Sequence, residues 1–503
     1  MRRTLRWVGA GLLVALLVIL LVRPWVWLMC LPPIPEQLPP SDQLRQPPLQ
    51  PGTFPGELAE LLASTELPAV PATGTREPLP PEVRSRFRAT ASALQEKLEE
   101  VLQAPRGHWI RPDKQQESLD LLSNVRQLAR LLELSGRLAL ADGDRDQARR
   151  TAVLLIRMGR RLTEGTSAPG FLVGIAVEHL GCRLLLLWMD SPELSAEELR
   201  GLCKQLKALK EKRESWDELV RWKYAETRDL LKKPTGITKA QALLLNYLGF
   251  LGPCPISVAR VVCRDAQNWD ELPPEKLWLQ PWRPSGPDVP PRVPGLSITR
   301  ASLDRKVVRN PFVWSFVSPF RHLLRAHRRA ELSTRIVFAT AAAHTHRLTT
   351  GQWPRTLSQE QLARVGLTST DVHDPFRQQQ LLWFPHKGAL LRRARQLASE
   401  GTDPSKERLR ELRNLLKDFP NSSPIVWVPL GASESSVDDF GTSLFLVDRA
   451  AIEWLEERQA ARWDPESLRD SGQLPAPSRS QPQAGPKRAP EAASDRAGDD
   501  GRD

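Results

Sequence analysis

Histidines and an aspartate that could bind a metal ion gather in the last third of the chain. The stretch HTHRLTTGQWPRTL, residues 344–357, contains His344 and His346, and His373 and Asp374 follow it. Imidazole nitrogens and carboxylates are the ligands with which metal-dependent hydrolases hold zinc or manganese. On one helix, however, two histidines at this spacing point about 200° apart, whereas helical metal pairs use a spacing of four residues. A shared metal site therefore requires the helix to end between them.

The same stretch also has the features of a hinge between a long helix and a small module. Gly351 can take the left-handed conformation that ends a helix, and Pro354 prevents the helix from resuming. Trp353 can pack back against that helix, and Ser358-x-x-Gln361 is a capping box for a short helix. This interpretation predicts no catalytic residue, and it places both histidines of the stretch at a polar helix end.

The order of these features resembles the C-terminal region of type II secretion pseudopilins. The matching residues are Gly351, Trp353, Pro354, Leu357, Asp374, Pro375 and Phe376. Residues 436–441, SVDDFG, resemble the acidic late loop in which some pseudopilins bind calcium. The resemblance implies Asp438 and Asp439 as calcium ligands, and we expect no other cofactor. It does not extend to the pseudopilin processing site, because Gly9 precedes AGLLVALL, which contains no Glu.

Several elements must position these residues. Periodicity predicts a helix at about 321–350, strands at 381–384, 424–430 and 443–447, and an amphipathic basic helix pair at 389–418. The Pro- and Trp-rich residues 271–300 are expected to connect this part, 301–462, to a separate helical lobe at 83–270. The tail, 463–503, has the composition of a disordered segment.

The helical lobe is predicted to contain a helix–turn–helix hairpin. Apolar residues recur at helical spacing on both sides of ADGDRD, where Gly143 is suited to end the first helix and Asp144 to begin the second. The hairpin resembles a single tetratricopeptide-type unit. Residues 171–189 are apolar on nearly all sides, but Glu178, His179 and Arg183 favour a buried central helix over a membrane span. Ser195-x-x-Glu198 is a capping box for a further helix that the pattern continues to about Leu231.

The N-terminus has the pattern of a membrane anchor. Residues 7–31 are mostly apolar and follow Arg2, Arg3 and Arg6. Because no small-x-small cleavage site follows, we predict an uncleaved transmembrane helix rather than a signal peptide. The positive-inside rule places the N-terminus in the cytoplasm and the rest of the chain outside it. Residues 32–82 are rich in proline and are predicted to form a stalk that reaches up to about 150 Å, with one short helix inside it at GELAELLAST, residues 56–65.

Charge and cysteine content add little more. The chain has 503 residues, a net charge of +12 and five cysteines. The arginines are spread along predicted helices, so a solvated surface explains them, and we expect no nucleic-acid partner. No C-x-x-C pair is present. Cys254 and Cys263 could form a disulfide in an oxidising compartment, and the other cysteines are expected to be buried free thiols.

The sequence thus predicts a mostly α fold with a small α+β C-terminal module. Its layout resembles envelope proteins of large-genome bacteria such as planctomycetes and myxobacteria. Two functions remain open. The first is a non-enzymatic, single-pass inner-membrane scaffold that binds another protein and could be linked to a secretion or surface apparatus. The second is a metal-dependent periplasmic hydrolase that uses His344, His346, His373 and Asp374.

Overall fold

The computed structural model describes most of the chain between residues 49 and 446. The described residues are 49–68, 80–107, 109, 115–166, 168–221, 223, 266, 311–375, 379–399, 416–417, 419–420, 423–427 and 444–446. All of them belong to one compact unit, Met1–Glu453. The predicted anchor, the connector and the tail lie outside the described residues, as do Phe376, Asp438, Asp439, Cys254 and Cys263.

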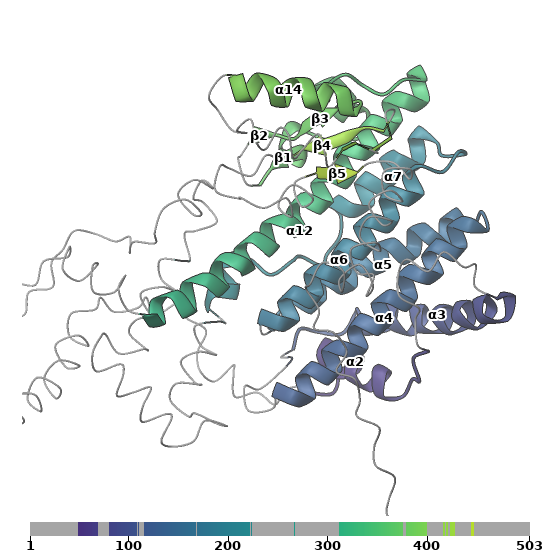
Figure 1. Cartoon of the computed structure of the whole chain (residues 1–503). Helices are drawn as coiled ribbons and strands as arrows, with labels where there is room; N and C mark the ends of the chain where they lie inside the picture. The colour runs from purple at the N-terminus through teal and green to yellow at the C-terminus, as the bar shows by residue number, and fades with distance from the viewer. Residues whose placement is uncertain are drawn as a thin grey trace, which may run out of the picture. The chain divides into compact units, whose positions relative to one another are not determined.

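The described part is mostly helical, with two small antiparallel sheets, as the sequence predicts (Figure 1). The helices are α2 (Phe54–Ala63), α3 (Pro81–Val101), α4 (Gln115–Ala141), α5 (Arg145–Thr163), α6 (Ala168–Met189), α7 (Ala196–Lys207), α12 (Pro311–Thr350), α13 (Gln359–Arg364), the 3-10 helix η6 (Ser369–Val372) and α14 (Lys387–Ser399). The strands are β1 (His373–Asp374), β2 (Gln379–Gln380), β3 (Leu382–Phe384), β4 (Ile425–Trp427) and β5 (Leu444–Leu446).

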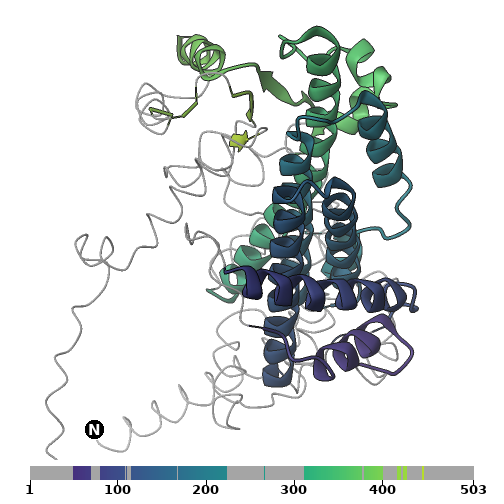
Figure 2. The same ribbon diagram turned by 90° about the vertical axis from the view of Figure 1, so that its right-hand side faces the viewer.

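Helices α4 and α5 form the predicted hairpin. Gly143 has a φ of +83°, a conformation that residues with a Cβ rarely adopt. The Asp144 side chain accepts a hydrogen bond of 3.0 Å from the backbone N–H of Gln147 and so caps α5. Helix α3 lies crosswise on this hairpin (Figure 2).

Helix α6 packs against α4, α5 and α12. Among the described residues it is the one helix with the length and apolar composition of a membrane span, and more than half of it is buried. It approaches α5 closely because glycines line the contact. A Cβ on Gly159 would lie 2.4 Å from the backbone nitrogen of Glu178. The packing agrees with a buried central helix.

Helix α7 begins with the predicted capping box, in which Ser195 and Glu198 exchange hydrogen bonds. The predicted continuation to about Leu231 is wrong at residues 208–215, where the chain leaves the helix. The physical reason lies in two ion pairs. Outside the helix, Glu211 reaches an arginine of α5 and Arg213 reaches Glu178 in α6. Helical structure resumes at Trp216.

The prediction of a stalk is wrong for residues 49–68, because helix α2 packs against the other helices. Its apolar residues are buried and belong to the same hydrophobic cluster as those of the main helices: Phe54, Leu58, Leu61 and Leu62. It packs against α3 and α4. Proline density suggested an extended segment around one short helix. That helix is α2, and Pro55 lies in its first turn, where the missing N–H is not needed. Residues 49–68 are therefore part of the folded body.

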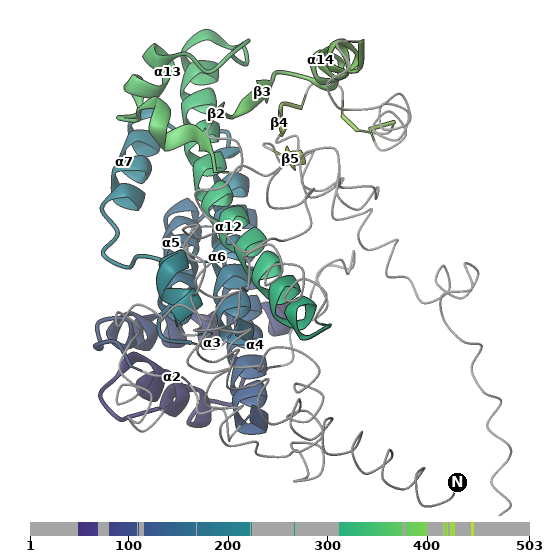
Figure 3. The ribbon, with the colours of Figure 1, turned by 90° about the vertical axis from the view of Figure 1, so that its left-hand side faces the viewer.

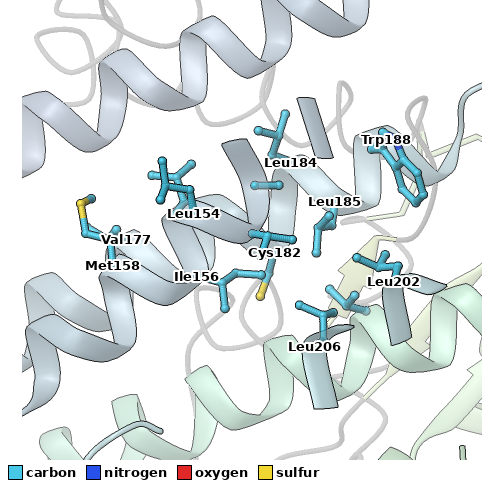
Figure 4. Packing of buried hydrophobic residues seen from close by; sticks show 14 of the residues in the cluster. Leu154, Ile156, Met158, Val177, Cys182, Leu184, Leu185, Trp188, Leu202 and Leu206 are labelled. Carbon is cyan, nitrogen blue, oxygen red and sulfur yellow. The ribbon is translucent and has the colours of Figure 1, made fainter. Parts of the chain in front are cut away.

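Helix α12 joins the two expected lobes. It begins at Pro311 in the described residues, earlier than predicted, and packs against α6 and α7 (Figure 3). One hydrophobic cluster contains residues from α2 through β4. Figure 4 shows part of it, where side chains of α5, α6 and α7 gather around Cys182. The packing thus does not separate residues before 271 from those after 300.

The predicted strands form the second sheet. β3, β4 and β5 pair antiparallel in that order, with Trp383 opposite Val426 and Val426 opposite Phe445. β1 and β2 form a separate hairpin. Helix α14 packs on β3 and β4 and matches the first of the two predicted basic helices. The second lies outside the described residues.

Candidate functional site

The hinge after α12 has the predicted geometry. Gly351 has a φ of +76°, and its N–H donates a 2.7 Å hydrogen bond to the carbonyl of Arg347. Ser358 and Gln361 form the predicted capping box at the start of α13. Gly351 therefore ends α12 in the left-handed conformation, and the chain turns back toward the helix.

Trp353 fixes the direction in which the chain turns. Its ring meets the His344 ring edge to face, with centroids 4.8 Å apart, and the Arg347 guanidinium lies 4.6 Å from its centroid. The ring centroids of Trp383 in β3 and Trp353 are 6.0 Å apart. The indole N–H of Trp383 donates a 2.9 Å hydrogen bond to the carbonyl of Pro354. The hinge is thus packed between α12 and the sheet, in agreement with the predicted role of Trp353.

The histidines of this region have different surroundings. His344 is only 4% exposed, so its predicted place at a polar helix end is wrong. The helix continues to Thr350, which leaves His344 on the face that Trp353 covers. His346 is half-buried, and its Nδ1 lies 3.4 Å from Nε2 of Gln361.

The other residues of the predicted metal site, His373 and Asp374, form β1. His373 Nδ1 lies 3.2 Å from the carbonyl oxygen of Ser369. Asp374 is buried and pairs with Gln379 across the β1–β2 hairpin. Within the described ranges, no group of three or more His, Cys, Asp or Glu side chains is placed to hold a metal ion.

A buried ion cluster lies at the junction of α5, α6 and α12. Glu178 of α6 has no exposed surface. Its carboxylate accepts hydrogen bonds from Arg160 of α5 at 3.1 Å, from Nε and Nη2 of Arg213 at 3.0 and 2.8 Å, and from the hydroxyl of Thr334 of α12 at 3.3 Å. The four side chains come from three helices and from the segment 208–215, and the cluster therefore ties these elements together.

The electrostatics of this cluster favour a structural role. Burial alone would raise the pKa of Glu178, but the charges and hydrogen bonds of Arg213 and Arg160 hold its pKa below the usual value. The carboxylate therefore stays ionised, and its oxygens are occupied by donors. Such a group is poorly suited to accept a proton from a substrate.

A second polar cluster follows at the C-terminal end of α5. Glu214 accepts a hydrogen bond from the N–H of Gly165 at 3.2 Å, while its own N–H donates to the Thr163 hydroxyl at 3.1 Å. Glu164 pairs with Arg161 at 2.5 Å and with Arg106 at 3.3 Å. Burial raises the pKa of Glu214, and the hydrogen bond from Gly165 offsets this only in part.

The sequence pointed to part of these clusters. Glu178 stood out as an acid in an apolar helix, which is a signal for a buried charge with a partner. Its partners are separated from it by 18 and 35 residues, and no spacing rule connects such positions. His179, next to Glu178, lies within hydrogen-bonding distance of α12, because its Nδ1 is 3.1 Å from the Ser333 hydroxyl.

The two cysteines in the described residues, Cys182 and Cys203, are buried free thiols, as predicted. Burial raises the pKa of each to about 12. Both therefore remain protonated at neutral pH and are poor nucleophiles.

No protein-family model, curated protein or solved structure matches this chain. The roles of these residues are therefore argued from their own contacts.

Proposed function

We propose that the chain is a single-pass protein of the bacterial inner membrane whose helical body binds another protein without catalysing a reaction. Residues 7–31 supply the anchor in this proposal, with the N-terminus in the cytoplasm. The body, outside the cytoplasm in this proposal, contains the helical hairpin α4–α5, which resembles a single unit of the tetratricopeptide type, a class of repeat used to bind proteins. In its more specific form, the proposal links the protein to a secretion or surface apparatus.

The proposal rests on the contacts and the burial of the reactive side chains in the body. Glu178 is neutralised by two arginines, and His344 packs against Trp353. Cys182 and Cys203 are buried thiols. These side chains contribute to the packing of the helices. This structural role supports a scaffold function.

Photo-crosslinking in native membranes tests the binding function. A photoreactive amino acid would be placed at Asn124, which is exposed on α4. A control would carry it at Glu360 in α13. We expect an adduct of defined mass from position 124 that is absent from position 360. Mass spectrometry would identify the partner, and equal adducts from both positions would contradict the proposal.

The proposed topology has its own test. Alkaline phosphatase fused after residue 470 should be active, because this enzyme folds only outside the cytoplasm. An inactive fusion, together with an active cytoplasmic reporter at the same position, would overturn the orientation.

Metal analysis of the purified protein separates the scaffold from the hydrolase alternative. The alternative requires stoichiometric zinc or manganese that is lost in His346→Ala. Such a result would replace the scaffold proposal, whereas metal below stoichiometry in the unmodified protein would support it.

A further inference from the structure

The first helix of the body is fastened at its N-terminal end. The N–H of Phe54 donates to the carbonyl of Pro105 at 2.9 Å. Its ring meets Trp109 edge to face, with centroids 5.5 Å apart, and the Arg161 guanidinium lies 5.0 Å from its centroid. Phe54 and Trp109 are each 1% exposed. The chain is therefore held against α5 and the end of α3 from this point on.

The segment that follows α2 is fastened as well. The side-chain amide of Gln127 in α4 donates to the carbonyls of Leu67 and Pro68, each at 3.1 Å. At the other end, Gly107 lies so close to Thr53 that a Cβ on it would be 2.6 Å from the Thr53 side chain, and Gln50 in turn lies against Gly56 of α2. Contacts at both ends hold residues 50–68 as one docked piece.

This docking shortens the chain between membrane and body. A stalk of residues 32–82 would contain about 50 residues and could reach about 150 Å as a polyproline helix, or at most about 180 Å fully extended. With α2 docked, about 17 residues, 32–48, remain between the proposed span and Leu49, and they can cover at most about 60 Å whatever conformation they adopt.

We infer that residues 32–48 alone tether the body, and that the partner of the body is a protein in or on the same membrane. The inference rests on the proposed function, because it takes residues 7–31 as the membrane span. The point at which the chain joins the body then lies within about 60 Å of the end of that span. A binding surface held there stays near the membrane, where it meets a partner confined to the same membrane at a raised effective concentration.

Two insertions of equal length test this inference in the full chain, reconstituted in vesicles that contain an acceptor-labelled lipid. A fluorescent donor amino acid would replace Glu99, which is exposed on α3. One variant receives a Gly/Ser insert of about 30 residues after residue 40, which lengthens the average reach of the tether by about 15 Å. The matched control receives the same insert after residue 74, between α2 and α3, which both pack in the body.

The docked helix predicts different results for the two inserts. Energy transfer to the lipid should fall for the insert after residue 40 and stay at the wild-type level for the insert after residue 74. Equal losses for both inserts would mean that α2 is part of the tether, and unchanged transfer for both would mean that the tether does not set the distance. Either result overturns the inference. A full chain that does not stay with the vesicles would instead refute the proposed anchor.

The partner provides the second measurement. The protein crosslinked at position 124 should remain in the membrane fraction, and its adduct yield should fall only for the insert after residue 40. A soluble partner, or a yield unaffected by that insert, would contradict the assignment to the same membrane.

Discussion

Gly351 stands where the backbone has a φ of +76°, and a Cβ on it would meet no other atom within 4 Å. The cost of Gly351→Ala is therefore conformational strain alone, which we expect to lower the free energy of unfolding by about 1–2 kcal/mol. Gly201, inside α7, is the matched control, because it also has open space but lies in an ordinary helical conformation. Gly201→Ala should raise stability by about 0.5–1 kcal/mol. Denaturant unfolding of the detergent-solubilised chain measures both, and effects of the same sign would refute the capping role.

His344 and His346 differ in burial, so their alanine variants should differ too. His344→Ala removes a buried ring from Trp353 and should cost about 1–3 kcal/mol. His346→Ala should cost less than about 1 kcal/mol, because its side chain is half-buried at the helix end. The hydrolase alternative predicts severe losses for both variants and a similar loss when a chelator is added to the unmodified protein. Thermal melts with and without chelator distinguish the two patterns.

Glu214 should make stability depend on pH in a particular direction. Its pKa in the folded state is raised by burial, so the folded protein binds this proton more tightly than the unfolded chain does. The resulting stabilisation is complete below the unfolded pKa and is lost as pH rises through the folded value. Glu214→Gln removes this dependence and can still accept from Gly165. Between pH 4.5 and 7.5, roughly the range above the unfolded value, the stability of wild type relative to the variant should fall. Parallel curves would contradict the raised pKa.

At the scale of elements, the contact between α5 and α6 depends on glycine. A Cβ on Gly159 would lie 2.4 Å from the backbone nitrogen of Glu178 and 2.7 Å from the carbonyl oxygen of Gly174. Gly159→Ala should therefore push the helices apart and disturb the pairing of Glu178, at a cost of about 1–3 kcal/mol or more. Gly136 in α4 is the control, because a Cβ there meets only the side chain of Leu184. We expect Gly136→Ala to cost clearly less in the same unfolding measurement, and equal costs would show that the backbone approach does not matter.

The interruption of the helix at residues 208–215 is explained by contacts with neighbouring elements. An uninterrupted helix would have been locally acceptable, but it would have removed Glu211 and Arg213 from the arginine and the glutamate that they pair with. Leaving Glu178 without one of its arginines would cost several kcal/mol, because a buried charge would lose its counter-charge. That cost exceeds the small preference of a few residues for helix.

At the scale of the whole molecule, the shared core predicts cooperative unfolding. Residues of α12 and of the sheet belong to the same hydrophobic cluster as α2 to α7. Differential scanning calorimetry of the full chain should therefore show one main transition for the body. Removal of residues 301–453 should lower or abolish that transition, because it exposes the faces of α6 and α7 that α12 covers. Two transitions, one of them unchanged in the truncated chain, would restore the two-lobe organisation.

Local patterns in the sequence determined the helical class, the hairpin turn at Gly143 and Asp144, the capping boxes at Ser195 and Ser358, and the strands of the second sheet. They also determined the left-handed glycine that ends α12. Each of these features depends on residues within a few positions of one another, where backbone sterics and short hydrogen bonds act. A single sequence carries such information directly.

Only the tertiary structure decided how these elements combine. It placed α2 in the core, joined α12 to α6 and α7, and brought Arg160, Arg213 and Thr334 to Glu178. Burial of apolar surface is not directional, so many partners could cover the apolar face of α2 or α12 equally well. The actual partner depends on the packing of the whole chain, and a buried charge accepts whichever counter-charge that packing brings near. For this reason the hinge could be read from residues 351–361, whereas the ion cluster at Glu178 could not.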